Sequence, residues 1–401
     1  MEILNQPFSG HFGDRLIEML DSKKYRSLNM IVAFAKNSGF LRIKDALERF
    51  RDRGGEINAY VGVDLGGTSY EALIGLHLAV DSLYVVHAET SQTFHSKIYN
   101  FIGEHESLAN VGSHNLTGGG LWTNFESSAF LSAARFGKSE PDFQTAIDDY
   151  IKNLTNLGDS FQKIENRDQI DHLLEHEYVL KEVIQHVRRN ESESSELEKE
   201  LSKLFGPGAP ASLPRVSRKI PTVSERAIPN LDENPVLWYA TQKMTGGSGN
   251  QFDLSKTSFV VEGDPSGTPY EIADKKFMRG TVEFFGVDSS AEEETTTITI
   301  NFDGRDYEGN IIRMHQNKRS NGTWRLQLQG ADSTGRQIND AFRSKGGSDY
   351  LKQTIVTFMR ISDRYYSMSV FSERNVDRFK KASQLWGHNG PTATGRPIGI
   401  I

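Results

Sequence analysis

The stretch TFHSKIYNFIGEHESLANVGSHNLTGGGLWTNFE fills residues 93–126 and combines strand-forming residues with side chains that can carry out chemistry. We predict a strand over residues 94–102. Because side chains alternate along a strand, His95 and Lys97 should project from the same face. This arrangement places an imidazole, which titrates near neutral pH, beside an ammonium group that can bind a phosphate oxygen.

Three further polar side chains follow in a fixed order. Ser113 and Asn115 lie in a Gly-Ser turn after a strand predicted near 108–112, and Glu126 comes just before the apolar run SSAFLSA. Asn115 is 20 positions and Glu126 is 31 positions after His95. A single His-x-Lys or Gly-Ser-x-Asn arises often by chance, but the ordered set around strand ends indicates a catalytic site.

The sequence around this stretch predicts an α/β domain with a mixed sheet flanked by helices. The run LNMIVAFAK is continuously apolar, as expected for a strand buried on both faces, and FLRIKDALERFRDRGG has helical spacing of its apolar residues. Strand, helix and strand in this order form a βαβ unit. Helices are predicted over 14–23, 40–55, 70–80, 141–161 and 172–189, and further strands over 28–36, 56–67, 82–88 and 127–133.

The composition changes after residue 190, where the chain becomes first highly charged and then rich in Pro, Gly and Ser. A segment of this kind buries little apolar surface and is expected to form an extended linker. We therefore divide the chain into an N-terminal domain (1–190), a linker (191–231) and a C-terminal domain (232–401).

The C-terminal domain is predicted to be mostly β, as a barrel or a sandwich. Short runs of β-branched and aromatic residues, among them GTVEFFGV at 280–287, alternate with Gly, Asn, Asp and Ser turns. Asn321-Gly322 predicts a hairpin, because a type I′ turn needs positive φ at both central positions. Short helices are predicted at 348–352 and 374–383.

The composition of the chain excludes some classes of function and favours others. The 401 residues carry 46 Lys and Arg against 53 Asp and Glu, a formal net charge of −7, and no cysteine. The lack of cysteine excludes disulfides and Cys-ligated zinc, and the overall charge gives no sign of nucleic acid, although a local basic surface is enough to bind it. No signal-peptide pattern or bilayer-length apolar run occurs, so we expect a cytoplasmic protein without a membrane partner.

The motif residues resemble those of the phospholipase D-like phosphodiesterases. That superfamily is marked by His-x-Lys followed by a Gly-Ser turn with an Asn, which His-Ser-Lys at 95–97 and Gly-Ser-His-Asn at 112–115 match. Ile102 stands where many members have an Asp, and together with Glu126 this departure is similar to the nuclease branch. The set resembles the metal-independent restriction endonucleases of the BfiI and NgoAVII type, which implies a phospholipase D-like N-terminal domain and a C-terminal B3-like pseudobarrel that recognises DNA.

The resemblance also implies a mechanism that uses no metal or other cofactor and passes through a phosphohistidine. His95 would attack the phosphorus, and a second histidine would protonate the departing oxygen and then activate water. Lys97 would neutralise the phosphate oxygens, while Asn115 and Ser113 would donate hydrogen bonds to them. Glu126 would accept a hydrogen bond from His95 and fix its tautomer.

Two histidines are required by that mechanism, but the chain holds a single His-x-Lys in this context. The second half of the site must then come from another copy of the chain. We therefore predict a homodimer formed through the N-terminal domains, with one composite active site at the interface.

The C-terminal domain is the predicted reader of double-stranded DNA. Phosphate contacts carry no base information, so a phosphate-gripping nuclease needs a separate source of specificity. Arg, Asn and Gln read base edges, whereas Lys mainly binds phosphates. The candidate DNA-binding residues are Arg313, Lys318, Arg319, Asn321, Trp324 and Arg325, with a weaker patch at Lys275 and Arg279.

The predicted function is a sequence-specific DNA endonuclease of a restriction system, and two alternatives stay open. One is a phospholipase D-like phosphodiesterase that acts on a lipid or another substrate. The other is a nuclease subunit of a larger defence complex with a separate ATP-dependent helicase or translocase. The chain has no P-loop sequence, so any use of ATP would belong to that other subunit.

Overall fold

The structure is a computed structural model, and it describes residues 1–134, 141–193, 208–209, 212–214, 216, 234–241, 250–288, 295–314 and 323–401. The chain forms two compact units. The N-terminal unit holds Met1–Glu182 and the described residues of Leu204–Pro214, and the C-terminal unit holds the described residues of Val183–Lys203 and Arg215–Ile401.

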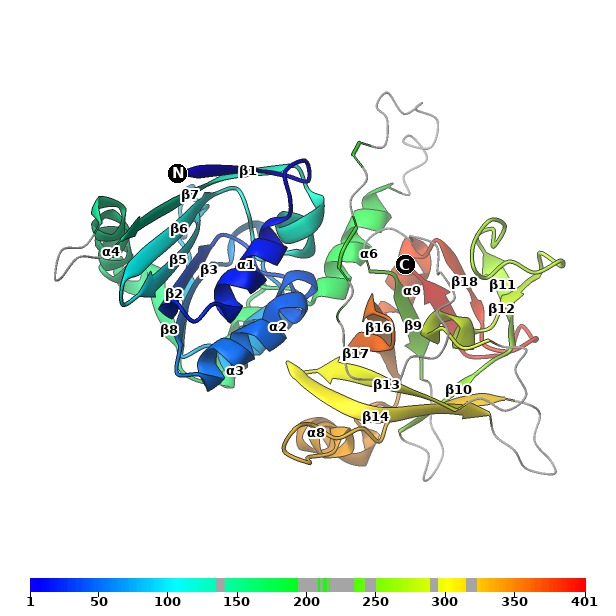
Figure 1. Ribbon diagram of the computed structural model, residues 1–401. Coiled ribbons are helices and arrows are strands. Elements are labelled where there is room, and N and C mark those ends of the chain that lie inside the picture. The colour runs from blue at the N-terminus through cyan, green and yellow to red at the C-terminus, as the bar shows by residue number, and fades with distance from the viewer. Residues whose placement is uncertain are drawn as a thin grey trace. The chain divides into compact units, whose positions relative to one another are not determined.

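The N-terminal unit is built on one mixed sheet of eight strands in the order β1-β7-β6-β5-β2-β3-β4-β8 (Figure 1). The three adjacent strands β2, β3 and β4 run parallel, and the other neighbours pair antiparallel. The strands are β1 (Glu2–Gln6), β2 (Tyr25–Val32), β3 (Glu56–Gly62), β4 (Ser82–Val86), β5 (Lys97–Gly103), β6 (Glu106–Gly112), β7 (Glu126–Ala134) and β8 (Phe161–Ile164).

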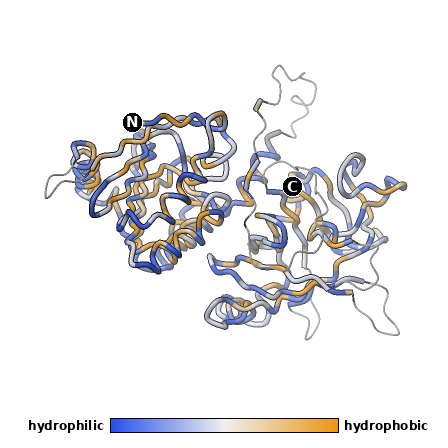
Figure 2. The backbone as a smooth tube through the Cα atoms, viewed as in Figure 1, coloured by the Kyte–Doolittle hydropathy of each residue, from blue (hydrophilic) through white to orange (hydrophobic). Residues whose placement is uncertain are grey.

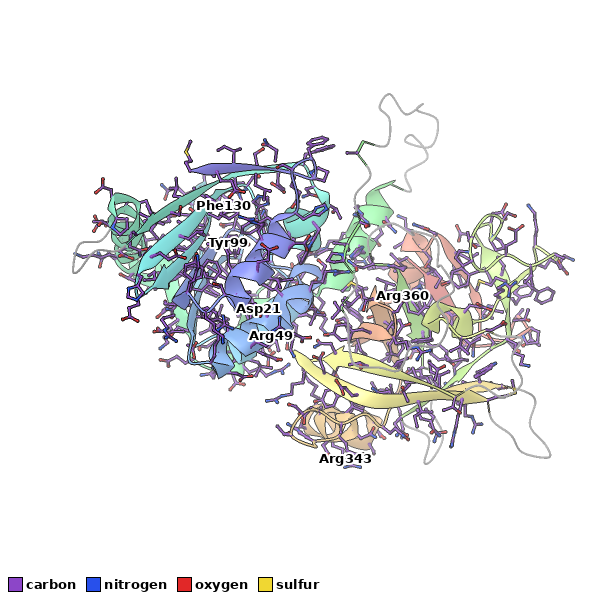
Figure 3. All side chains as sticks on the ribbon, viewed as in Figure 1. Asp21, Arg49, Tyr99, Phe130, Arg343 and Arg360 are labelled. Carbon is purple, nitrogen blue, oxygen red and sulfur yellow. The ribbon has the colours of Figure 1, made fainter. Side chains whose placement is uncertain are left out.

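Helices cover both faces of this sheet, as the alternation of side chains along β5 shows. On one face, the ring of Tyr99 packs against Phe12 of α1, with ring centroids 4.7 Å apart (Tyr99 is labelled in Figure 3). The next residue on that face, Phe101, packs against Phe50 of α2, with ring centroids 6.4 Å apart. On the other face, Ile98 packs in a cluster with residues of α4. The helices are α1 (Phe12–Asp21), α2 (Asn37–Asp52), α3 (Tyr70–Ala79), α4 (Asp142–Thr155) and α5 (Arg167–Glu175).

The α/β prediction for the N-terminal domain is confirmed, because each predicted helix and strand before residue 160 has a counterpart in the structure. Two predicted boundaries need correction. The predicted strand over 94–102 begins at Lys97 and ends at Gly103, and the single helix predicted over 172–189 is replaced by parts of α5 and of α6 (Glu182–Glu193). Helix α6 continues past residue 190, and most of the predicted linker lies outside the described residues.

The arrangement of strands brings several strand ends to the same end of the sheet. Val32, the last residue of β2, pairs with Lys97, the first residue of β5. Gly112, at the end of β6, pairs with Ser128 near the start of β7, and β3 and β4 end beside each other at Gly62 and Val86. We call this the site end of the sheet, since the carboxyl ends of parallel strands are where α/β proteins bind ligands.

A buried carboxylate holds the helices behind the site end. Glu182 is 2% exposed, and its side chain accepts hydrogen bonds from the backbone N–H groups of Asn37 (2.6 Å) and Ser38 (3.2 Å) at the start of α2. The hydroxyl of Ser69, the residue before α3, donates to the same carboxylate at 3.0 Å. A negative charge at two helix N-termini satisfies otherwise unpaired N–H groups and interacts favourably with both helix dipoles.

The C-terminal unit is a second sheet of eleven strands in the order β10-β15-β14-β13-β17-β16-β9-β19-β18-β11-β12. Hydrophobic residues recur along the strands of both units (Figure 2). The strands are β9 (Val236–Ala240), β10 (Gln251–Leu254), β11 (Thr257–Glu262), β12 (Phe277–Arg279), β13 (Thr295–Phe302), β14 (Arg305–Met314), β15 (Trp324–Gln327), β16 (Thr354–Ser362), β17 (Tyr365–Ser372), β18 (Leu385–His388) and β19 (Pro397–Ile400).

The mostly β class predicted for the C-terminal domain is therefore confirmed, with corrections in detail. Residues 280–287 were predicted as a strand but contain a 3-10 helix, Thr281–Phe285, and helix α8 (Ile338–Gly346) was not predicted. Strands β14 and β15 pair antiparallel, as the predicted hairpin requires, while the Asn321-Gly322 turn lies outside the described residues. No pairing closes the sheet between its edge strands β10 and β12 in the described ranges, and a B3-like pseudobarrel remains a prediction.

Within the described part of the chain, no helix is long and apolar enough to cross a membrane.

The anchoring role of Glu182 leads to a stability prediction. We expect Glu182→Ala to lower the free energy of unfolding of the N-terminal unit by about 2–4 kcal/mol, because several buried donors lose their acceptor. Glu18→Ala is the control, since the Glu18 side chain is 69% exposed and its ion pair with Arg15 is long at 3.9 Å. Urea unfolding followed by circular dichroism measures both, and equal effects of the two substitutions would contradict the anchoring role.

Candidate active site

The His-x-Lys segment enters the sheet at the site end. Lys97 opens strand β5, whereas His95 lies in the extended stretch just before it, so the prediction that both sit within one strand is wrong. The two side chains are nevertheless in direct contact. The ammonium of Lys97 donates to the carbonyl oxygen of His95 at 2.8 Å and lies 2.7 Å from Nδ1 and 3.2 Å from Nε2 of its ring.

These distances show how the ammonium meets the imidazole. The lone pairs of the two ring nitrogens lie in the ring plane and point in different directions, so one ammonium cannot make in-plane hydrogen bonds to both. Lys97 therefore lies beside the ring of His95 rather than on the axis of one nitrogen. Since His95 is exposed and Lys97 is only 7% exposed, the imidazole is the outermost group of the pair.

The residues around His95 are held at three points. The backbone N–H of Phe94 donates to Asp64 at 2.8 Å, and the hydroxyls of Ser96 and Tyr150 are hydrogen-bonded at 2.6 Å. The ring of Phe34 meets the imidazole edge-on, with centroids 5.7 Å apart. These contacts come from α4 and from the segments that follow β3 and β2, so His95 is exposed but its backbone is fixed.

A buried histidine supports the Gly-Ser turn. His114 is fully buried and stacks on Phe12 with ring centroids 4.5 Å apart. Its Nδ1 lies 2.9 Å from the carbonyl oxygen of Gly120, and its Nε2 lies 2.9 Å from the hydroxyl of Ser128. Burial lowers the pKa of His114, although its hydrogen bond to Gly120 acts in the opposite direction. A neutral ring that donates from Nδ1 and accepts at Nε2 satisfies both contacts, so His114 is structural.

Asn115, the next residue, is placed as a hydrogen-bond donor. Its Oδ1 accepts from the backbone N–H of Phe34 at 3.1 Å, so the donor end of the amide, Nδ2, points away from that contact. The same loop is tied to β2 by the backbone bond from Leu116 to Phe34 at 3.0 Å. Helix α2 approaches this loop closely at Gly39, where an added Cβ would lie 2.7 Å from the carbonyl oxygen of Leu116. Phe34 thus contacts both His95 and Asn115.

Ser113 uses its hydroxyl within the sheet. The hydroxyl accepts from the backbone N–H of Ser127 at 3.1 Å and donates to its carbonyl oxygen at 3.4 Å. Binding a phosphate oxygen would require Ser113 to give up the second of these bonds.

Glu126 does not have the predicted partner. Its carboxylate accepts a hydrogen bond from the side chain of Asn124 at 3.2 Å, and no hydrogen bond joins it to His95 among the described residues. Its charge acts on Lys97 instead. Burial lowers the pKa of Lys97, and the Coulombic attraction of Glu126 partly opposes that effect. The predicted hydrogen bond from His95 to Glu126 is therefore not formed among the described residues, and the role of Glu126 stays a prediction.

Two residues near the site were not predicted from the sequence. Asp64 and His87 follow β3 and β4 at the site end and are joined by a contact of 2.6 Å. Neither belongs to a motif, and only the side-by-side ends of two parallel strands bring them together. Over the ranges that the structure describes, no three His, Asp or Glu side chains are grouped so that they could hold a metal ion.

The predicted DNA-binding residues differ in their exposure. Arg313 on β14 is exposed and lies directly opposite Arg325 on β15, whose side chain pairs with Asp253 at 2.9 Å. Trp324 is fully buried in the core, so its predicted contact with DNA is wrong, because an indole that packs inside cannot reach a groove. Lys318, Arg319 and Asn321 lie outside the described residues.

The weaker patch consists of paired side chains. Lys275 lies 3.4 Å from Asp264, and Arg279 lies 3.3 Å from Glu283. Each of these cations is partly neutralised by a neighbouring carboxylate, which weakens the case for this patch as a phosphate-binding surface.

Comparisons with known proteins give similarities to solved structures. No family model and no curated protein matches the chain. Nuc from Salmonella typhimurium, a phospholipase D family member, is similar over 41% of this chain and 97% of its own, with 17% identity and a TM-score of 0.31. NucT from Helicobacter pylori matches over 38% and 94%, with 14% identity and a TM-score of 0.29. Phosphatidylserine synthase from Haemophilus influenzae matches over 40% and 41%, with 10% identity and a TM-score of 0.26. Similarities of this size do not identify a function, which has to come from the residues of the site.

The burial of Lys97 leads to a prediction about stability and pH. A lysine whose folded pKa lies below its unfolded value destabilises the fold at neutral pH, and this penalty fades as pH rises from the folded pKa towards the unfolded value of 10.5. We expect Lys97→Met to raise the free energy of unfolding at pH 7 by about 0.5–2 kcal/mol, with a smaller gain at pH 10. Denaturant unfolding at both pH values tests this, and a Lys97→Met protein less stable than wild type at pH 7 would contradict it.

Proposed function

We propose that this chain is a phospholipase D-like endonuclease that hydrolyses phosphodiesters of double-stranded DNA without a metal ion, as the nuclease of a restriction system. The observation that carries the proposal is the contact between the exposed imidazole of His95 and the ammonium of Lys97. Asn115 lies at the same end of the sheet, because Phe34 contacts both the His95 ring and the Asn115 side chain. An exposed nucleophile, a fixed cation and an amide donor are what phosphoryl transfer needs when the protein supplies the charge stabilisation.

The proposed reaction has two displacement steps. In the first, a ring nitrogen of His95 attacks the phosphorus and forms a P–N bond, the P–O bond to the leaving strand breaks, and a second histidine gives that oxygen a proton. In the second, water attacks the phosphorus, the second histidine takes the proton of the water, and the P–N bond breaks. Lys97 moves from the imidazole to the phosphate oxygens, and Asn115 donates to them from Nδ2.

The second histidine is proposed to come from another copy of the chain. His114 is buried and bonded on both nitrogens, and His87 is engaged by Asp64, so neither is placed like the exposed His95. A homodimer in which the site ends of the two copies face each other would supply two equivalent His95 imidazoles.

An exposed aromatic pair supports this arrangement and marks the surface that we assign to the dimer contact. Phe8 and Phe125 are 75% and 64% exposed and stack with centroids 5.6 Å apart, and Phe125 directly precedes Glu126. The buried side chain of Gln6 holds the backbone just before Phe125 by donating to the carbonyl oxygen of Asn124 at 3.1 Å. Two stacked, exposed aromatic rings beside a site that needs a second copy are suited to form the apolar centre of the interface.

Sequence recognition is proposed to lie in the C-terminal unit, as a B3-like domain. Arg313 and Arg325 are opposite each other on neighbouring strands. Among the residues that the structure describes, Arg325 pairs with Asp253 and Arg313 forms no ion pair. Next to them on the same face, Gln251 and Gln327 form a second cross-strand pair. Arginine and glutamine are side chains that read guanine and adenine edges, so this face is the proposed contact surface for DNA.

The direct test is cleavage of plasmid DNA by the purified protein in EDTA. We expect wild type to cut and His95→Ala to lose at least about 10³-fold in rate, because the nucleophile is removed. His105→Ala is the matched control, since His105 is exposed at the opposite end of the same β5–β6 hairpin. Cleavage that needs Mg²⁺ or survives His95→Ala would overturn the proposal.

The products of the same reaction separate the remaining alternatives. Fragments of fixed size support a sequence-specific reader, whereas a smear indicates a non-specific nuclease. Cleavage that appears only after an ATPase is added would favour the subunit of a larger complex. Hydrolysis of a lipid phosphodiester without DNA cleavage would favour the phosphodiesterase alternative.

The proposed interface gives a separate prediction. We expect Phe125→Glu to weaken the dimer by about tenfold or more, because a carboxylate would be forced into an apolar contact, and to lower cleavage in proportion to the loss of dimer. Leu78→Glu is the control, since Leu78 is 41% exposed on α3. Sedimentation velocity at several protein concentrations measures the association, and a wild-type monomer that cuts DNA would contradict the composite site.

A further inference from the structure

A carboxylate–imidazole pair lies beside the catalytic segment and has no part in the mechanism described so far. Asp64 is 6% exposed, and its two oxygens bind two different partners. Oδ1 lies 2.6 Å from Nδ1 of His87, and Oδ2 accepts the backbone N–H of Phe94 at 2.8 Å. Phe94 directly precedes His95 in the chain. The Asp64 carboxylate therefore connects His87 to the backbone next to the proposed nucleophile.

The surroundings of Phe94 make this joint rigid. The Phe94 side chain packs in the hydrophobic cluster between the sheet and α4. Its ring also lies close to Gly62 at the end of β3. A Cβ added to Gly62 would be 2.9 Å from the Phe94 ring and 2.7 Å from the carbonyl oxygen of Ala33. Phe94 is thus held by packing on one side and by Asp64 at its backbone. A shift of Asp64 would be transmitted to His95 through a single peptide unit.

The loop that carries Asp64 adopts a conformation that side chains usually avoid. Leu65 has a φ of 56° and Gly66 a φ of 62°, both in the left-handed region. Left-handed backbone costs a residue such as leucine about 1–2 kcal/mol. The Leu65 side chain is 85% exposed, so its own packing does not offset this cost. Strain of this kind persists where the surrounding structure holds the backbone, and it collects at functional sites.

The imidazole of His87 is oriented from its other side as well. Its Nε2 lies 3.8 Å from Glu89, and the ring of Tyr178 meets it edge-on at 5.1 Å between centroids. The Tyr178 hydroxyl in turn donates to Glu89. With these contacts the Nδ1–H of His87 points at Asp64, the arrangement by which a paired imidazole fixes a carboxylate.

We propose that Asp64, held by His87, is a positioning residue that aims His95 at the phosphorus through the backbone N–H of Phe94. The inference rests on the proposed function and adds two residues that act on the nucleophile without touching the substrate. It replaces Glu126, whose carboxylate bonds to Asn124, as the acidic group that controls the geometry of His95.

The experiment compares single-turnover cleavage at saturating DNA with DNA affinity measured separately by anisotropy. Asp64→Asn keeps the size of the side chain but removes the charge and one acceptor, and we expect the cleavage rate to fall about 10- to 100-fold with unchanged affinity, as a misplacement of about 1 Å does. His87→Ala should show the same pattern. His87→Gln should recover most of the rate, because its amide can still donate to Asp64.

Asp81→Asn is the matched control at the opposite end of the sheet. Asp81 also joins a cation to a backbone N–H, since it pairs with Arg51 at 3.1 Å and accepts from Ile57 at 2.8 Å. We expect Asp81→Asn to change thermal stability but to leave the cleavage rate near that of wild type. A purely structural role of Asp64 would give the two substitutions the same pattern.

Two outcomes overturn the inference on its own. If wild type cuts, His95→Ala does not, and Asp64→Asn cuts at the wild-type rate, the positioning role is wrong while the proposed function stands. If His87→Gln is as slow as His87→Ala, the hydrogen bond to Asp64 is not what His87 supplies. Failure of wild type to cut, or cleavage by His95→Ala, would instead refute the proposed function.

Discussion

The antiparallel register between β2 and β5 is the constraint on which the rest of the site depends. The pairing of Val32 with Lys97 puts the first residue of β5 where β2 ends. Two residues further on, Phe34 contacts the ring of His95 and donates its N–H to Asn115. A slip of one residue would turn every side chain of β5 to the other face of the sheet, so the hydrophobic faces under α1, α2 and α4 also fix the position of the ammonium.

Lys97 shows how stability and chemistry oppose each other at this sheet end. Burial disfavours its charge, yet a desolvated ammonium binds a phosphate more strongly than one in water. The neighbouring charge of Glu126 lessens the penalty without forming a hydrogen bond to the lysine among the described residues. His114 is also buried, but it avoids the cost of a buried charge because burial lowers its pKa and both ring nitrogens are hydrogen-bonded. It holds the turn before Asn115.

Most helices and strands could be predicted from the sequence, because the spacing of hydrophobic residues and the positions of turn residues depend on each element alone. The proximity of His95 and Lys97 was expected from their spacing of two residues, although His95 lies before the strand that Lys97 begins. The hydrogen bond of Glu126 to Asn124 was not predicted, since the sequence does not show which of several nearby polar groups the carboxylate faces. Asp64 and His87 are 23 positions apart and meet because β3 and β4 lie side by side in the sheet. The run at 280–287 was misread because its buried Val282, Phe284 and Phe285 suit a short helix as well as a strand.

The buried carboxylate of Glu182 has a consequence for how the N-terminal unit can be isolated. Glu182 is the last residue of the N-terminal unit before the chain leaves it and also the first residue of α6. The boundary between the units therefore falls inside a helix, one residue beyond an anchor that closes the first turn of α2. A fragment designed to stop at residue 180 would keep every motif residue but would expose the N–H groups of Asn37 and Ser38. A fragment of the N-terminal unit therefore has to include Glu182, in addition to the motif residues, to keep this acceptor at the start of α2.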